Sequence, residues 1–190
     1  MTKNEQKIAV LFPGIGYTCD RSLLYYSGKL LQSQGYEVIR LSYGGFPANV
    51  KGDAEGIRQC IAIALEQVEE QLKEVDFNAY DDVVFAGKSI GTIVALQYAQ
   101  EHGLDSRYVL LTPLEQTFGG AALQGNRAIA FHGTADPWAR TDEIISACKS
   151  RSIPLYLTEG ANHSLETGDV SKDIDNLQQV MEQIRQFITN

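Results

Sequence analysis

One serine in this sequence has the surroundings of a nucleophile. Ser89 is the middle residue of GKSIG at positions 87–91, so Gly87 and Gly91 flank it two residues away on either side. An apolar, β-branched run at 82–86 ends directly before the motif, and a helical pattern at 90–102 begins within it. A serine on such a sharp turn projects its hydroxyl over a helix N-terminus, which favours developing negative charge. The two glycines relieve the crowding that this turn creates.

Two phosphate-binding motifs are alternatives to this interpretation. The lysine and serine of GKSIG match the end of the pattern GxxxxGK[ST], but that pattern requires glycine at the position of Asp82. Strand residues also take the place of the phosphate-binding loop. Gly14 and Gly16 begin a GxGxxG pattern, whose third glycine would fall on Cys19. Both matches are therefore incomplete, and the nucleophile is favoured.

A serine hydroxyl reacts only when a base accepts its proton and a carboxylate orients that base. The chain has three histidines, so the choice of base is narrow. His163 follows the sixth predicted strand and Asp136 follows the fifth, at the strand ends where parallel sheets carry their functional loops. We predict His163 as the base and Asp136 as the acid. Glu115, after the fourth predicted strand, is the alternative acid.

The remaining reactive side chains have simpler interpretations. His102 falls in the last turn of a predicted helix, where a solvated cation is favourable. His132 is expected to be a buried, hydrogen-bonded support for the turn that carries Asp136. Lys88 is expected to turn outward into solvent, and the alternative is that its ammonium lies near the site and favours anionic substrates. Cys19 has no adjacent base and is expected to be a small apolar filler.

Short apolar runs alternate with longer helical patterns along the chain and would position these residues. The predicted strands are Ile8–Phe12, Glu37–Leu41, Asp82–Ala86, Tyr108–Leu111, Ala128–Phe131 and Leu155–Leu157. The predicted helices are Asp20–Gln34, Asp53–Val75, Ile90–His102, Thr141–Ser150 and Asp173–Ile188. This order predicts one α/β domain over residues 1–190, with an open parallel sheet covered by helices on both faces. Residues 114–126, rich in Gly, Gln and Ala, predict a loop with one turn of helix in place of a full crossover helix.

Composition excludes several classes of function. The chain of 190 residues is 44% hydrophobic and 21% charged, as in ordinary globular domains. The net charge of −8 argues against nucleic acid and anionic membranes as partners. No apolar run is long enough to span a bilayer, and the N-terminal sequence lacks a secretory signal. Three widely spaced cysteines without metal-ligand spacing fit a reduced, cytoplasmic protein that binds no metal.

Three stretches together resemble the signature of the α/β-hydrolase superfamily. They are GKSIG at 87–91, HGTADP at 132–137 and the pair Asn-His at 162–163, in the superfamily order of serine, aspartate and histidine. The resemblance extends over essentially the whole chain, and it implies the same roles for Ser89, Asp136 and His163. It also implies a three-layer αβα fold with a minimal core of six parallel strands in the spatial order 2-1-3-4-5-6.

The negative charge of a tetrahedral intermediate requires preorganised N–H donors. One expected donor is the backbone amide of Ile90, directly after the serine. The second should come from the loop after the first strand, residues 12–17, which resembles the superfamily's His-Gly-x-x loop with Pro13 in place of the histidine. Ile15 is the first choice in this loop and Gly16 the next.

These features predict a serine hydrolase that cleaves an ester or thioester of a small-molecule acyl substrate without a cofactor. Residues 114–126 are too few for the cap that larger members insert, so we expect an open site and short acyl groups. An acyltransferase or a peptide-directed hydrolase would use the same residues. A non-catalytic binding protein that retains the fold is a further alternative.

Overall fold

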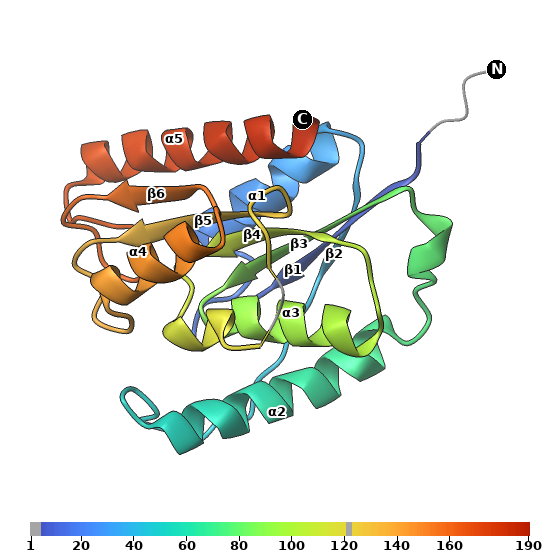
Figure 1. Ribbon diagram of the computed structural model, residues 1–190, viewed down its shortest axis with the longest axis horizontal. Coiled ribbons are helices and arrows are strands. Elements are labelled where there is room, and N and C mark those ends of the chain that lie inside the picture. Colours follow the sequence, from blue (N-terminus) through green and yellow to red (C-terminus); the bar gives the residue numbers. More distant parts are fainter. Residues whose placement is uncertain (1–4, 121–122) are drawn as a thin grey trace.

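The computed structural model describes residues 5–120 and 123–190. Its six strands form one sheet in the order β2-β1-β3-β4-β5-β6, and every neighbouring pair is parallel (Figure 1). The strands are β1 (Lys7–Phe12), β2 (Glu37–Arg40), β3 (Asp82–Lys88), β4 (Arg107–Leu111), β5 (Ala128–Gly133) and β6 (Leu155–Thr158). This confirms the predicted sheet and its strand order.

Helices cover both faces of the sheet, which gives three layers (Figure 1). The helices are α1 (Ser22–Ser33), α2 (Ala54–Leu72), α3 (Ile90–Glu101), α4 (Thr141–Ser150) and α5 (Val170–Thr189), with short 3₁₀ turns η1 (Phe77–Ala79) and η2 (Glu115–Phe118). Helices α1 and α5 pack on one face and α2, α3 and α4 on the other. Alternate residues of the central strands supply the two cores, since Val84 and Ala86 face α1 and α5 while Phe85 faces the opposite layer.

Local residue types explain where the helices begin and end. The carboxylate of Asp53 accepts the Glu55 amide at the start of α2, and Asp169 does the same for two amides at the start of α5. Helices α1 and α3 are followed by Gly35 and Gly103, whose φ angles are +86° and +62°. This is the left-handed conformation that glycine adopts most readily after a helix.

The connection between β4 and β5 contains little regular secondary structure, and this affects access to the site. Among its described residues the only helical element is η2, so the predicted loop with one turn of helix is confirmed there, and residues 121–122 lie outside the described part. The hydroxyls of Thr117 in η2 and Thr92 in α3 lie 2.7 Å apart and hold this turn against the helix. No helix in the described residues has the length and apolarity needed to cross a bilayer.

Candidate active site

The turn that carries Ser89 joins β3 directly to α3. Ser89 has φ of +56° and ψ of −122°, a strained backbone conformation for a residue other than glycine. A Cβ atom at Gly91 would lie 2.2 Å from the carbonyl oxygen of Phe12, and one at Gly87 would lie 2.6 Å from that of Gly91. Glycine is therefore required at both positions, for the crowding reason predicted from the motif.

The fold brings Ser89, His163 and Asp136 into one chain of hydrogen bonds. His163 Nε2 lies 2.8 Å from Ser89 Oγ, and His163 Nδ1 lies 2.7 Å from Asp136 Oδ2. Because a carboxylate can only accept, Nδ1 carries the hydrogen and Nε2 is free to accept the serine proton. Asp136 also accepts the Trp138 amide at Oδ1, over 2.8 Å. This arrangement can activate a hydroxyl for attack on an electrophilic carbon.

Backbone bonds tie together the loops that carry the acid and the base. The Ala135 amide donates to the Ala161 carbonyl over 2.9 Å, and the Asp136 amide donates to Gly133 over 3.0 Å. A Cβ at Gly133 would lie 2.3 Å from the Ala161 oxygen, so only glycine allows the loops to approach this closely. The position of Asp136 relative to His163 is thus fixed by main chain as well as by side chains.

Burial and neighbouring charges set the protonation of the pair. Burial lowers the pKa of His163 below its ordinary value, the hydrogen bond that His163 donates to Asp136 opposes this, and the positive charge of Lys88 adds to the lowering. Burial favours the neutral form of Asp136, but the hydrogen bond and charge of His163 outweigh it and hold the pKa of the carboxyl below its usual range. At neutral pH the site therefore holds a neutral imidazole and an ionised carboxylate.

The alternative acid does not reach the imidazole. Glu115 Oε1 accepts the Arg140 amide over 2.7 Å, whereas Asp136 occupies the position beside His163. His132 is fully buried and its Nε2 lies 3.0 Å from Thr141 Oγ1, so it packs behind the Asp136 turn as expected. Its Nδ1 lies 3.8 Å from Asp136 Oδ2 and has no hydrogen-bond partner among the described residues.

The loop after β1 lies directly against the serine. A tight turn is closed by hydrogen bonds in both directions between Gly14 and Tyr17, of 3.0 and 3.2 Å, with Gly16 at φ of +66°. A Cβ at Gly14 would lie only 3.2 Å from the Cβ of Ser89. The two predicted donors, Ile15 and Gly16, are the central residues of this turn, and their N–H groups are not used to close it.

Comparison with protein families gives the same fold assignment. The sequence matches the family described as "Alpha/beta hydrolase domain" over residues 5–189. The chain belongs to the α/β-hydrolase family. Comparison with curated protein sequences gives no match.

Solved structures of α/β hydrolases resemble this hydrolase over nearly its whole length. Est1E from Butyrivibrio proteoclasticus with bound ferulic acid is 14% identical, with a TM-score of 0.67 over 99% of this chain and 90% of that one. A serine hydrolase homologue from Coxiella burnetii is 15% identical, with a TM-score of 0.66 over 97% and 86%. A serine hydrolase without a lid from Xanthomonas campestris is 14% identical, with a TM-score of 0.56 over 97% and 85%. At these identities the likeness establishes the fold.

The expectation that Lys88 turns into solvent is wrong. In this hydrolase β3 continues through Lys88 instead of ending at residue 86, so the alternation of the strand directs Lys88 to the same face as Val84 and Ala86. Only 2% of the residue is exposed. Its Nζ lies 5.0 Å from the centre of the Tyr17 ring.

Cys19 has the role that the sequence indicates. It is buried, its Sγ lies 3.3 Å from the Leu41 carbonyl oxygen, and burial raises the pKa of the thiol to about 12. A thiol with so high a pKa is not a competing nucleophile. The third histidine, His102, lies at the end of α3, where its Nε2 is 2.7 Å from Glu69 Oε1.

Sequence reasoning missed two contacts of the hydrolase site. The indole of Trp138 stacks on the His163 imidazole, with ring centroids 5.5 Å apart and planes at 22°. Gly14 belongs to the loop of residues 12–17 that is expected to supply a donor, but the sequence gives no sign that it approaches Ser89 directly. The adjacency of Trp138 to Asp136 was a visible signal, whereas the approach of Gly14 to Ser89 depends on how two distant loops meet.

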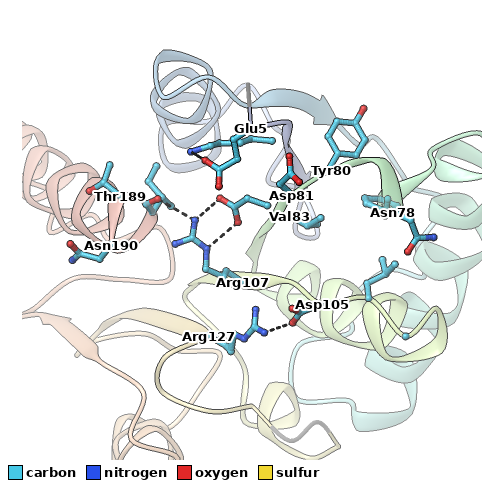
Figure 2. A pocket seen from close by; sticks show the side chains of 16 residues that line it. Glu5, Asn78, Tyr80, Asp81, Val83, Asp105, Arg107, Arg127, Thr189 and Asn190 are labelled. Carbon is cyan, nitrogen blue, oxygen red and sulfur yellow. Dashed lines mark hydrogen bonds and ion pairs between the residues drawn. The ribbon is translucent and has the colours of Figure 1, made fainter. Parts of the chain in front are cut away.

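A polar hollow lies at the amino ends of the strands, at the opposite edge of the sheet from Ser89 (Figure 2). Arg107 at its centre donates to both oxygens of Asp82, and to the carbonyls of Phe187 and Ile188 at the end of α5. Arg127 pairs with Asp105 at the rim. These guanidinium groups are paired within the protein, so the hollow is a structural joint between β3, β4 and α5.

Among residues 5–120 and 123–190, no group of three or more His, Cys, Asp and Glu side chains is arranged to hold a metal ion.

Proposed function

We propose that this α/β hydrolase cleaves carboxylic esters or thioesters through an acyl-enzyme on Ser89. The observation that carries the proposal is the unbroken series of hydrogen bonds from Ser89 Oγ through His163 to Asp136, with heavy-atom distances of 2.8 and 2.7 Å. Such a series activates a serine for attack on a carbonyl carbon.

The reaction proceeds in two halves. His163 Nε2 accepts the proton of Ser89 as Oγ attacks the carbonyl, and the resulting imidazolium gives that proton to the departing alcohol or thiol. An acyl group is left on Ser89. His163 then accepts a proton from water, whose oxygen attacks the acyl carbon, and returns the proton to Ser89 as the acid leaves.

Backbone amides stabilise the oxyanion in both halves. The amide of Ile90 belongs to the first turn of α3, where N–H groups have no acceptor within the helix. Ile15 or Gly16, in the turn that packs on Ser89, supplies the second donor. Each such donor contributes roughly 10²-fold to 10³-fold in rate.

A short acyl group is the favoured substrate. Apart from η2, the described residues between β4 and β5 form no helix or strand that could add an apolar wall for a long chain. One structural relative has no lid, and another was obtained with ferulic acid, a carboxylic acid of modest size. The first comparison supports an uncapped site, and the second supports a small acyl group.

A fluorophosphonate probe tests the nucleophile. We expect the purified protein to be labelled and Ser89→Ala to be unlabelled, while Ser150→Ala, at the exposed end of α4, is labelled like the natural chain. Folding of each variant is checked by circular dichroism. A folded natural chain that takes no label would favour the non-catalytic binding protein.

A second screen separates the possible substrates. Hydrolysis of p-nitrophenyl esters of increasing chain length is compared with that of acyl-CoA thioesters. A maximum at short chains is expected, and a clear maximum at long chains would contradict the open-site argument. Acyl transfer to an added alcohol or amine in preference to water would indicate the acyltransferase instead.

A further inference from the structure

Lys88 is a buried cation that the proposed reaction does not use. It is the last residue of β3, immediately before Ser89, and is 2% exposed. Among the residues that the structure describes, Lys88 forms no salt bridge, and its Nζ lies over the face of the Tyr17 ring, 5.0 Å from the ring centre. An ammonium buried without a paired carboxylate is costly, so this position needs a reason beyond packing.

The side chain of Lys88 passes behind the turn that supplies the second oxyanion donor. A Cβ at Gly14 would lie 3.4 Å from Lys88 Cδ and 3.1 Å from its carbonyl oxygen. Tyr17 closes that turn through its backbone, and its ring covers the ammonium. The Tyr17 hydroxyl accepts the Leu23 amide over 3.0 Å, which fixes the ring against the start of α1.

We propose that Lys88 is a positioning residue, whose ammonium holds the turn of residues 14–17 through the Tyr17 ring and places a positive charge behind Ser89 and His163. The proposal rests on the proposed function, because it concerns how the base of that reaction is kept ready. Lys88 touches neither substrate nor reacting atoms and acts through its neighbours.

The charges around Lys88 determine how this cation changes the pKa of His163, the proposed base. Asp136 and Glu166 attract it, and His163 is the neighbour that it repels when the imidazole is protonated. His132, on the far side of Asp136, also disfavours a proton on His163. Burial lowers the pKa of Lys88 to about 7, so in the more acidic range where His163 titrates the ammonium is charged. The cation therefore extends the neutral, base form of His163 to lower pH.

The pH dependence of kcat/KM tests the charge. In Lys88→Met the acidic limb should move to higher pH by about 0.5 to 1 unit, because the imidazolium is no longer repelled. In Lys88→Arg, which keeps a cation, the limb should stay near its natural position. Lys29→Met is the matched control, since Lys29 is an exposed cation whose Nζ is 5.8 Å from the Tyr25 ring. If Lys88 only supported the fold, Lys88→Met would change kcat/KM without shifting the acidic limb of its pH dependence. That result would overturn the proposal.

A nuclear magnetic resonance titration of the three histidines reads the same coupling without activity. His163 should titrate at higher pH in Lys88→Met than in the natural chain. If Lys88→Met does not fold, the natural chain suffices: the His163 signal should show a second step near pH 7, where Lys88 loses its proton. A His163 curve without that step would overturn the proposal, whereas absent labelling by fluorophosphonate would overturn only the hydrolase function.

Discussion

The indole of Trp138 stacks on the imidazole of His163, with centroids 5.5 Å apart, while its backbone amide donates to Asp136 over 2.8 Å. One residue therefore supports both the base and the acid. The indole ring also has a cation over it, because Lys51 Nζ lies 5.9 Å from the Trp138 ring centre. The side chain and the backbone of Trp138 have separable effects.

Replacing the indole should leave the His163 imidazole less firmly oriented. The hydrogen bond from the backbone amide of residue 138 to Asp136 would remain. In Trp138→Ala we expect kcat/KM to fall about tenfold or more, because a misplaced catalytic group loses rate steeply. Trp138→Phe retains a flat ring and should lose less. Steady-state hydrolysis of p-nitrophenyl acetate measures both variants, and equal rates for Trp138→Ala and the natural chain would show that the stack does not orient His163.

Asp136→Asn should reduce kcat about a thousandfold or more, because an amide no longer favours the tautomer with hydrogen on Nδ1. Glu115→Gln should retain most of the activity, since its carboxylate accepts the Arg140 amide. Single-turnover acylation of Ser89 compares the two variants at one pH. A larger loss in Glu115→Gln would transfer the acid role to that residue.

Burial of Lys88 should make stability depend on pH in a particular direction. Its pKa falls from 10.5 to about 7 on folding, so between these values the unfolded chain holds a proton that the folded chain lacks. This group therefore destabilises the fold fully below about pH 7, and the penalty fades as pH rises toward 10. The effect should amount to a few kcal/mol at neutral pH.

Lys88→Met removes this penalty. The free energy of unfolding of Lys88→Met should exceed that of the natural chain at pH 6, and the difference should shrink by pH 9. Urea unfolding at the two pH values, with Lys29→Met as the surface control, measures the change. A difference that stays constant over this range would mean that Lys88 keeps its proton in the folded protein up to pH 9, so that burial does not lower its pKa.

Gly91→Ala should destabilise the fold severely, because the new methyl group would lie 2.2 Å from the Phe12 carbonyl oxygen and no flexible side chain can move aside. Gly35→Ala is the control: its φ of +86° makes alanine unfavourable by about 1 kcal/mol, but nothing lies within 4 Å. Urea unfolding compares the two. Equal losses would show that the Phe12 carbonyl can move aside and that close approach does not require glycine at position 91.

Most of the fold could be predicted because its signals are local. Apolar runs, helix-ending glycines and the GKSIG turn indicate the elements directly, and the carboxyl ends of parallel strands bring Ser89, Asp136 and His163 to one edge. The orientation of Lys88 could not be read in this way. It depends on two further residues of strand pairing, which the pattern of β3 does not mark, and on Tyr17, which lies far from Lys88 along the chain.

The joint around Arg107 fastens the far end of α5, the helix that follows the loop with His163. Helix α5 begins at Val170, soon after His163, and its final carbonyls, on Phe187 and Ile188, are held by Arg107 (Figure 2). Shortening α5 by its last turn would strip a partly buried guanidinium of two acceptors and unfasten the helix from β4. Fusion tags and truncations at this end are thus not neutral choices, although the reacting groups lie at the other edge of the sheet.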